Sequence, residues 1–274
     1  MSAPKVSVRI PTYNHEKYIE HCLDSVLGDS YQDKELIIID DGSTDRTPEL
    51  IDQWIRTRQP EFSVLYKARE NRGLAKTLNE LIALCRGEYL VSLASDDYLL
   101  DGGIETRVSY LDLHVEMCAV MGDCVVVDDN DNLLYASGLT DLYSANLDRY
   151  FDADGLLNEI ISNWSVPGPV LMVRRGLYDR IGQYNEKLEI EDWDLYIRMA
   201  SQKLLGFVNE KVSAYRLHEN NICRRSDKMI WSHKQRLGTA MRNIINVPFG
   251  HKASMVRQML FYFYLIYVQR WYLM

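Results

Sequence analysis

The chain has 274 residues, a formal net charge of −8, and 47% hydrophobic and 26% charged residues, which excludes a disordered or collagen-like protein and allows one large domain with an appendage. Its five cysteines are odd in number, scattered and never spaced as C-x-x-C, which favours free thiols in a reducing compartment over a disulfide framework or a structural zinc site. The start lacks a signal-peptide pattern, and no apolar run reaches the roughly 18 residues of a membrane span, so we expect a cytoplasmic protein.

The first hundred residues alternate between short apolar strands and amphipathic helices. The apolar run 35–40 is continuous, as in a strand that is buried on both faces of a parallel sheet. The alternation predicts an α/β fold with a doubly wound, mostly parallel central sheet and helices on both faces. The predicted strands are 5–10, 35–40, 63–67 and 88–94, and the predicted helices are 17–27, 48–55 and 73–85.

The second half has a less regular pattern. A stretch rich in Tyr and Asp separates the first two strands of this half, and there is no internal repeat. We expect strands at 118–129, 169–175, 205–208 and 212–218, and a helix at 192–200. After about residue 225 the pattern is helical and strongly aromatic, with a break at Pro248–Gly250. We therefore divide the chain into a domain over 1–222 and a helical extension over 223–274.

The charge differs between these two parts. From Arg224 to the end there are nine Lys and Arg residues and one acid, a charge of +8, whereas residues 1–223 carry 22 bases and 38 acids, a charge of −16. An acidic body argues against a nucleic-acid partner. A basic, aromatic tail fits an anionic membrane surface. The alternative is a solvated basic helix pair that packs on the acidic body.

Polar clusters follow all four strands of the first half, and the carboxyl ends of parallel strands meet at one edge of a sheet, where ligands bind. The clusters are PTYNHEKY (11–18), DDGSTDRT (40–47), ENRGLAKT (70–77) and SDD (95–97). Neither G-x-G-x-x-G after the first strand nor G-x-x-x-x-G-K-[ST] is present, which disfavours a Rossmann dinucleotide site and a P-loop. Adjacent Asp96 and Asp97 suit Mg²⁺ or Mn²⁺ that bridges carboxylates to a diphosphate. The alternative is that SDD only caps a turn.

Three blocks of sequence resemble family 2 glycosyltransferases of the GT-A fold, of the type that builds bacterial surface polysaccharides. The first is VSVRIPTYNHEKYIEHCLDSVLGDSYQDKELIIIDDGSTDRT, the second is NRGLAKTLNELIALCRGEYLVSLASDD, and the third is PVLMVRRGLYDRIGQYNEKLEIEDWDLYIRMA. The resemblance covers about residues 5–220. It implies that residues 1–222 form the nucleotide-sugar-binding and catalytic domain.

The resemblance also implies a donor site. Its nucleotide contacts would be Pro11, Thr12, Tyr13, Asp40, Asp41, Arg72, Ser95 and Asp96. Asp41 has the alternative role of capping the turn before Gly42. The metal ligands would be Asp96, Asp97 and His218, and Arg224 and Arg225 could contact the diphosphate. His15 and His21 resemble ordinary surface or helix residues. Many members of the family read Asp-x-Asp-Asp where this chain has Ala94, which puts the ribose contact in doubt more than the metal contact.

The third block supplies the acceptor side. Sugar transfer with inversion is one displacement at the anomeric carbon, and it needs a carboxylate that takes the proton of the acceptor hydroxyl. The resemblance implies that Asp192 is this base and that Glu191 helps to place the acceptor or the base. Acids at a helix N-terminus are also favoured by the helix dipole, but Asp194 makes three acids in four residues. Trp193 would contact the acceptor sugar or lie buried as a core aromatic.

We therefore expect an inverting glycosyltransferase that moves a sugar from a UDP-linked donor to a hydroxyl of a glycan or lipid-linked saccharide. The basic tail would rest on the inner face of the plasma membrane, or form a dimer interface instead. Two other functions stay open. One is a nucleotidyltransferase that makes sugar nucleotides, although no Gly-rich basic loop follows the first strand. The other is a catalytically inactive sugar-nucleotide-binding scaffold protein.

Overall fold

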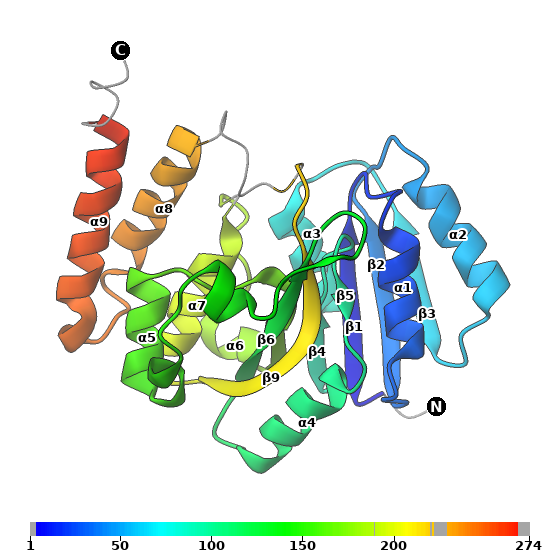
Figure 1. The fold of residues 1–274 in the computed structure, drawn as a ribbon, viewed down its shortest axis with the longest axis horizontal. Helices are drawn as coiled ribbons and strands as arrows, with labels where there is room; N and C mark the ends of the chain where they lie inside the picture. Colours follow the sequence, from blue (N-terminus) through cyan, green and yellow to red (C-terminus); the bar gives the residue numbers. More distant parts are fainter. Residues whose placement is uncertain (1–3, 189, 220, 222–228, 268–274) are drawn as a thin grey trace.

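The computed structural model describes residues 4–188, 190–219, 221 and 229–267. Helices cover both faces of a curled central sheet, and a pair of helices stands at one end of the molecule (Figure 1). The described strands form one sheet of nine, in the order β3-β2-β1-β4-β8-β6-β9-β5, with β7 paired to β6. The α/β fold with a C-terminal helical extension is therefore confirmed.

The first half alternates strand and helix as predicted. Strands β1 (Val6–Thr12), β2 (Lys34–Asp40), β3 (Ser63–Ala68) and β4 (Tyr89–Ser92) alternate with helices α1 (Ile19–Gly28), α2 (Thr47–Arg58) and α3 (Leu74–Leu84). Strand β1 lies between β2 and β4, and all pairings among these four strands are parallel. Their carboxyl ends therefore open at one edge of the sheet.

The second half adds antiparallel pairs. Strand β8 pairs antiparallel with β4 and β6, whereas β9 runs parallel to β6. The elements are β5 (Tyr98–Leu99), α4 (Gly103–Leu113), β6 (Ala119–Val127), β7 (Leu133–Tyr135), α5 (Ala153–Ser162), β8 (Leu171–Arg174), α6 (Leu177–Ile181), α7 (Glu191–Ser201) and β9 (Leu205–Arg216), with short turns of helix at Gly138–Leu142, Leu147–Phe151 and Gly168–Val170. The two predicted strands 205–208 and 212–218 are one strand, because the polar residues between them lie at an irregularity in the β6–β9 pairing rather than in a turn. Helices α4 and α5 were not predicted.

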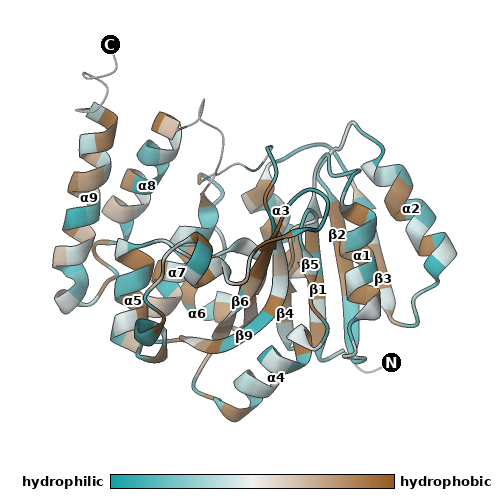
Figure 2. Ribbon diagram, in the orientation of Figure 1, coloured by the Kyte–Doolittle hydropathy of each residue, from teal (hydrophilic) through white to brown (hydrophobic). Residues whose placement is uncertain are grey.

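The continuous apolar run of β2 is buried on both faces of the sheet. Leu36 and Ile38 belong to a core shared with α1, α2 and α4. Ile37 and Ile39 belong to a second core, which includes side chains of α3, α5 and α7. Figure 2 shows the hydrophobic colour concentrated on the central strands. Burial on both faces explains why this strand has no polar alternation.

The C-terminal extension is helical, as predicted. It contains α8 (Met229–Asn243) and α9 (Lys252–Tyr267), and the predicted break is a turn of 3₁₀ helix at Phe249–His251. Ala240, Met255 and Tyr262 are buried in the same core as α5 and α7. The predicted boundary at residue 222 falls outside the described residues, and Arg224 and Arg225 also lie outside them. In the part that the structure describes, no helix is both long and apolar enough to cross a bilayer.

A buried arginine fastens the first half of the sheet to the segment that leads to α7. Arg9, at the middle of β1, is fully buried. Its Nη2 lies 2.6 Å from Ser92 Oγ on β4, 2.7 Å from the Tyr178 hydroxyl on α6 and 3.0 Å from the Tyr184 hydroxyl. Both tyrosine rings also lie within 6 Å of the guanidinium. These hydrogen bonds hold the chain at Tyr184, seven residues before α7 begins.

We predict that Arg9→Met lowers the free energy of unfolding by about 2 kcal/mol or more, because it leaves buried hydroxyl groups without their partner. Urea unfolding followed by circular dichroism measures the change. Arg58→Met is the control, since it removes an exposed ion pair with Asp24 and should change the free energy of unfolding much less. Equal losses in the two variants would contradict the structural role of Arg9.

Candidate active site

The loops after β1 and β2 meet at the carboxyl edge of the sheet, as predicted from the strand alternation. Asn14 is one of the residues that join them. Its side-chain oxygen accepts a hydrogen bond from the Thr44 backbone N–H at 2.8 Å, and its own backbone N–H donates to Ser43 Oγ at 2.8 Å. Asn14 has a left-handed backbone (φ 55°), which asparagine tolerates better than most residues. Pro11 and Thr12 end β1, and the next residue, Tyr13, is exposed.

The two aspartates after β2 have different roles. Asp40 accepts hydrogen bonds from the backbone N–H groups of Gly42 (3.0 Å) and Ser43 (2.8 Å). The turn-capping role that the sequence allowed for Asp41 therefore belongs to Asp40. Gly42 has φ +80°, and a Cβ there would lie 2.7 Å from the Asn71 backbone nitrogen, so the turn requires glycine.

Asp41 holds the loop that follows β3. Its buried carboxylate accepts hydrogen bonds from the backbone N–H groups of Arg72 (2.8 Å) and Gly73 (2.9 Å) and from the Arg69 guanidinium. The side chain of Arg72 is exposed at the same edge. Asp41 thus shapes the loop, and any direct contact with a nucleotide stays a prediction.

The SDD cluster lies against two histidines. Asp96 Oδ2 is 3.0 Å from His218 Nε2 and 3.9 Å from His15 Nε2, and His15 Nδ1 is 2.7 Å from Ser95 Oγ. Burial would raise the pKa of Asp96, but the His218 hydrogen bond and the charge of His15 outweigh it, so that the pKa is lowered. The interpretation of His15 as an ordinary surface residue was wrong. The ring of Tyr18 stacks on His218 at 5.0 Å between centroids.

Asp97 binds the end of strand β9. Its Oδ1 accepts a hydrogen bond from the backbone N–H of Arg216 at 2.9 Å. Burial and the neighbouring Asp96 raise its pKa well above the usual range. The two acids therefore differ in environment, and Asp97 as a metal ligand stays a prediction.

Two of the predicted metal ligands have a spacing that suits a divalent cation. Within the described ranges, no group of three or more His, Cys, Asp or Glu side chains is arranged to hold a metal ion. Asp96 Oδ2 and His218 Nε2 are 3.0 Å apart, which is about the separation of two adjacent ligands on an octahedral ion with bonds of about 2.1 Å. His218 Nδ1 is buried without a hydrogen-bond partner. These two side chains fit two positions of such an ion.

Glu191 and Asp192 begin helix α7. Glu191 is buried and Asp192 is half-buried, and the Asp192 carboxylate accepts the Trp193 backbone N–H at 2.7 Å. Burial, followed by the charge of Asp192, raises the pKa of Glu191 to about 8. Burial also raises the pKa of Asp192, although the Trp193 N–H and the charge of Arg236 on α8 oppose the shift. A carboxylate with a raised pKa is a better proton acceptor than an ordinary aspartate.

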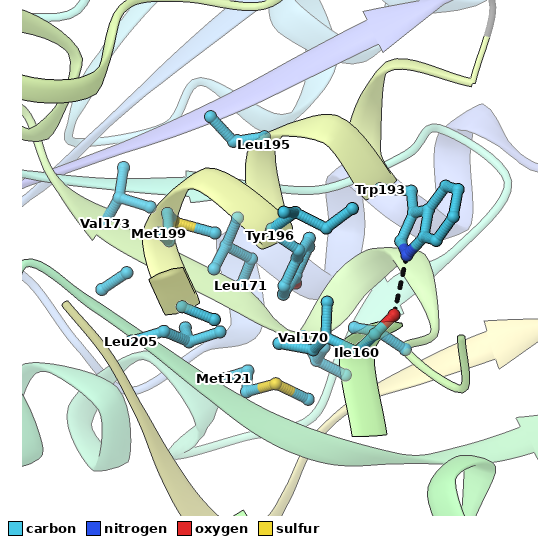
Figure 3. Packing of buried hydrophobic residues seen from close by; sticks show 14 of the residues in the cluster. Met121, Ile160, Val170, Leu171, Val173, Trp193, Leu195, Tyr196, Met199 and Leu205 are labelled. Atoms are coloured by element: carbon cyan, nitrogen blue, oxygen red, sulfur yellow. Dashed lines mark hydrogen bonds between the residues drawn. The ribbon is translucent and has the colours of Figure 1, made fainter. Parts of the chain in front are cut away.

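Trp193 and Asp194 are structural. Trp193 is 1% exposed, and its indole N–H donates to the Ile160 carbonyl at 2.7 Å (Figure 3). The prediction that Trp193 contacts the acceptor was therefore wrong, and the alternative of a buried aromatic holds. Asp194 accepts hydrogen bonds from Asn243 on α8 (2.7 Å) and from Arg198 (2.9 Å), so that it ties α7 to the extension.

Residues 7–182 match the family described as glycosyl transferase family 2. Among curated proteins, the chain is similar to glycosyltransferase GlyA of Streptococcus pneumoniae serotype 4, with 23% identity over 237 residues, 84% of this chain. The chain spans only 32% of the length of GlyA.

Two solved structures have the same fold. S. aureus TarS 1–349 in complex with UDP-GlcNAc gives a TM-score of 0.69 at 19% identity, over 95% of this chain and 72% of that one. The mannosyltransferase PcManGT from Pyrobaculum calidifontis, in complex with GDP-Man and Mn²⁺, also gives 0.69 at 19% identity, over 99% of this chain and 72% of that one. The fold is that of the GT-A glycosyltransferases, and the chain belongs to glycosyl transferase family 2.

Proposed function

We propose that the chain is an inverting glycosyltransferase that takes a sugar from a nucleoside diphosphate donor, with UDP as the favoured nucleotide. The observation that carries the proposal is the pairing of Asp96 with His218 at the strand ends. TarS and PcManGT, which share this fold, were solved with UDP-GlcNAc and with GDP-Man and Mn²⁺. The nucleotide would lie over Pro11, Thr12 and Tyr13.

Asp96 and His218 would hold Mg²⁺ or Mn²⁺, which supplies positive charge for the departing diphosphate. Asp192 then acts on the acceptor. The acceptor oxygen bonds to the anomeric carbon while the bond from that carbon to the diphosphate breaks, and the hydroxyl proton moves to the Asp192 carboxylate. Glu191, whose pKa is raised to about 8, stays protonated at neutral pH and leaves Asp192 as the charged member of the pair. We propose that the acceptor is a glycan or lipid-linked saccharide of a cell-surface polysaccharide.

The extension would place the enzyme at the inner face of the plasma membrane. The outer face of α9 carries apolar side chains at helical spacing, and Figure 2 shows hydrophobic segments along this helix at the edge of the molecule. Their exposed fractions are 44% for Val256, 65% for Leu260, 52% for Phe263 and 53% for Tyr267. Residues 229–267 contain five Lys and Arg residues and no acid. Aromatic and basic side chains together suit an anionic lipid surface.

We predict that Asp96→Ala lowers the affinity for UDP or GDP in the presence of Mn²⁺ by at least about 10-fold, because it removes a proposed metal ligand. Calorimetric titration with and without Mn²⁺ measures the effect. Asp101→Ala, which removes an exposed carboxylate five residues later, is the control and should bind like the wild type. Metal-dependent binding that survives in Asp96→Ala would contradict the assignment of this ligand.

We predict that Asp192→Asn slows release of the nucleoside diphosphate by roughly 10²- to 10⁴-fold, because it removes the base, while nucleotide affinity stays unchanged. Turnover of a donor sugar, with water or a glycan as acceptor, measures the rate. As the pH is lowered, wild-type activity should be lost at a higher pH than the pKa of an ordinary aspartate, because the pKa of Asp192 is raised.

Asp194→Asn is the matched control for the Asp192 variant. It changes a neighbouring acid that bonds to α8 and Arg198, so it should lower stability and keep turnover within a few-fold. A control that loses as much turnover as Asp192→Asn would show that the first effect is structural.

We predict that the full chain floats with vesicles that contain phosphatidylglycerol and not with vesicles of phosphatidylcholine alone. Leu260→Gln with Phe263→Gln should abolish flotation. Leu113→Gln with Val115→Gln, at positions 81% and 77% exposed near the end of α4, is the control and should still float. Absence of flotation, with a concentration-dependent mass in solution that the α9 variant reduces, would support the dimer interface instead.

A further inference from the structure

One residue contacts both acids of the SDD cluster. Arg216, the last residue of β9, is 2% exposed. Its backbone N–H donates to Asp97 Oδ1 at 2.9 Å, and its side-chain Nε donates to the Asp96 carbonyl at 2.9 Å. This side chain therefore binds the backbone of the residue whose carboxylate lies against His218.

The other end of the same guanidinium binds the turn between β6 and β7. Nη1 donates to the Asp128 carbonyl at 2.9 Å, and Nη2 is 2.7 Å from Asp131 Oδ1. The turn is internally ordered, because Asp128 Oδ1 accepts the backbone N–H groups of Asn130 and Asn132. Arg216 therefore joins an ordered turn to the loop that carries the proposed metal ligand.

Aromatic rings fix the plane of this guanidinium. The ring centroid of Tyr18 lies 5.1 Å from it, and that of Tyr98 lies 5.6 Å from it. Tyr18 also stacks on His218 and donates a hydrogen bond to Asp129 of the turn. A planar group with several donors fits this space, and a lysine ammonium cannot span the same acceptors.

We propose that Arg216 is a positioning residue for the donor site, which aims Asp96 at His218 and couples the 128–132 turn to metal-dependent nucleotide binding. This inference rests on the proposed function. Burying a charge is costly unless every donor finds an acceptor, and Arg216 bonds to acceptors in two separate loops. Replacing Arg216 should therefore lower the affinity for the nucleotide in the presence of the metal and leave the affinity without metal unchanged.

The test is calorimetric titration of UDP and GDP, with and without Mn²⁺, on the full chain. Arg216→Lys keeps the charge and loses the fork, and we expect at least about a 10-fold loss of affinity in Mn²⁺ and no loss without metal. Asp131→Asn, whose side chain is 44% exposed, should keep the fold and show a smaller loss in Mn²⁺. The double variant should bind like Arg216→Lys, because both changes break one connection.

Arg174→Lys is the matched control. Arg174 also donates to two backbone carbonyls, those of Met117 and Leu111, and lies against the ring of Tyr89, but Tyr89 begins β4 at the opposite edge of the sheet. The Arg174→Lys variant should be less stable than the wild type and should keep its Mn²⁺-dependent affinity for the nucleotide. Equal losses in Arg174→Lys and Arg216→Lys, or no loss in Arg216→Lys, would overturn the positioning role alone. If the wild type binds neither nucleotide in Mn²⁺, the proposed function itself fails.

Discussion

Every parallel strand of the first half delivers its carboxyl end to one edge of the sheet, and acidic residues follow β2 and β4 there. Buried like charges at one edge repel unless each carboxylate finds a donor. Asp40 accepts backbone N–H groups of its own turn, and Asp41 accepts those of the loop after β3 together with the Arg69 guanidinium. Asp96 instead faces imidazole rings, and an imidazole can serve as a hydrogen-bond donor or as a metal ligand. The need of each buried carboxylate for hydrogen-bond donors thus orders the loops around Asp40 and Asp41. Asp96 differs from them because its neighbours are histidines.

Two buried arginines connect these loops to the rest of the molecule in different ways. Arg9 lies inside the sheet and bonds to hydroxyl groups, so it joins β1 to the segment before α7. Arg216 lies at the end of the sheet and bonds to backbone carbonyls, so it joins loop to loop. Both are held in aromatic surroundings, which accept a flat cation more readily than a compact ammonium. The first arrangement lies beside the proposed acceptor site and the second beside the proposed donor site.

The sequence predicted the parts of the structure that depend on local pattern. Strand β2 could be predicted because a short apolar run without polar alternation is typical of a strand that is buried on both faces. The proximity of the polar loops could be predicted because the carboxyl ends of parallel strands lie at one edge of a sheet. Trp193 could not be assigned from its neighbours, since its burial depends on a carbonyl of α5, 33 residues away. Asp194 depends in the same way on Asn243. His15 has an ordinary local sequence, and its proximity to Asp96 follows from how two distant loops pack. The only feature of the sequence that points to Arg216 is its position as a charged residue at the end of a predicted strand.

The shared core of the extension has a consequence for engineering the chain. Ala240, Met255 and Tyr262 pack with α5 and α7, so a chain cut before Met229 would present that apolar surface to water and be prone to aggregate. The extension therefore cannot be exchanged as a module with a relative's C-terminus unless the matching faces of α5 and α7 are exchanged with it. The natural unit for transplantation runs from the sheet through α9.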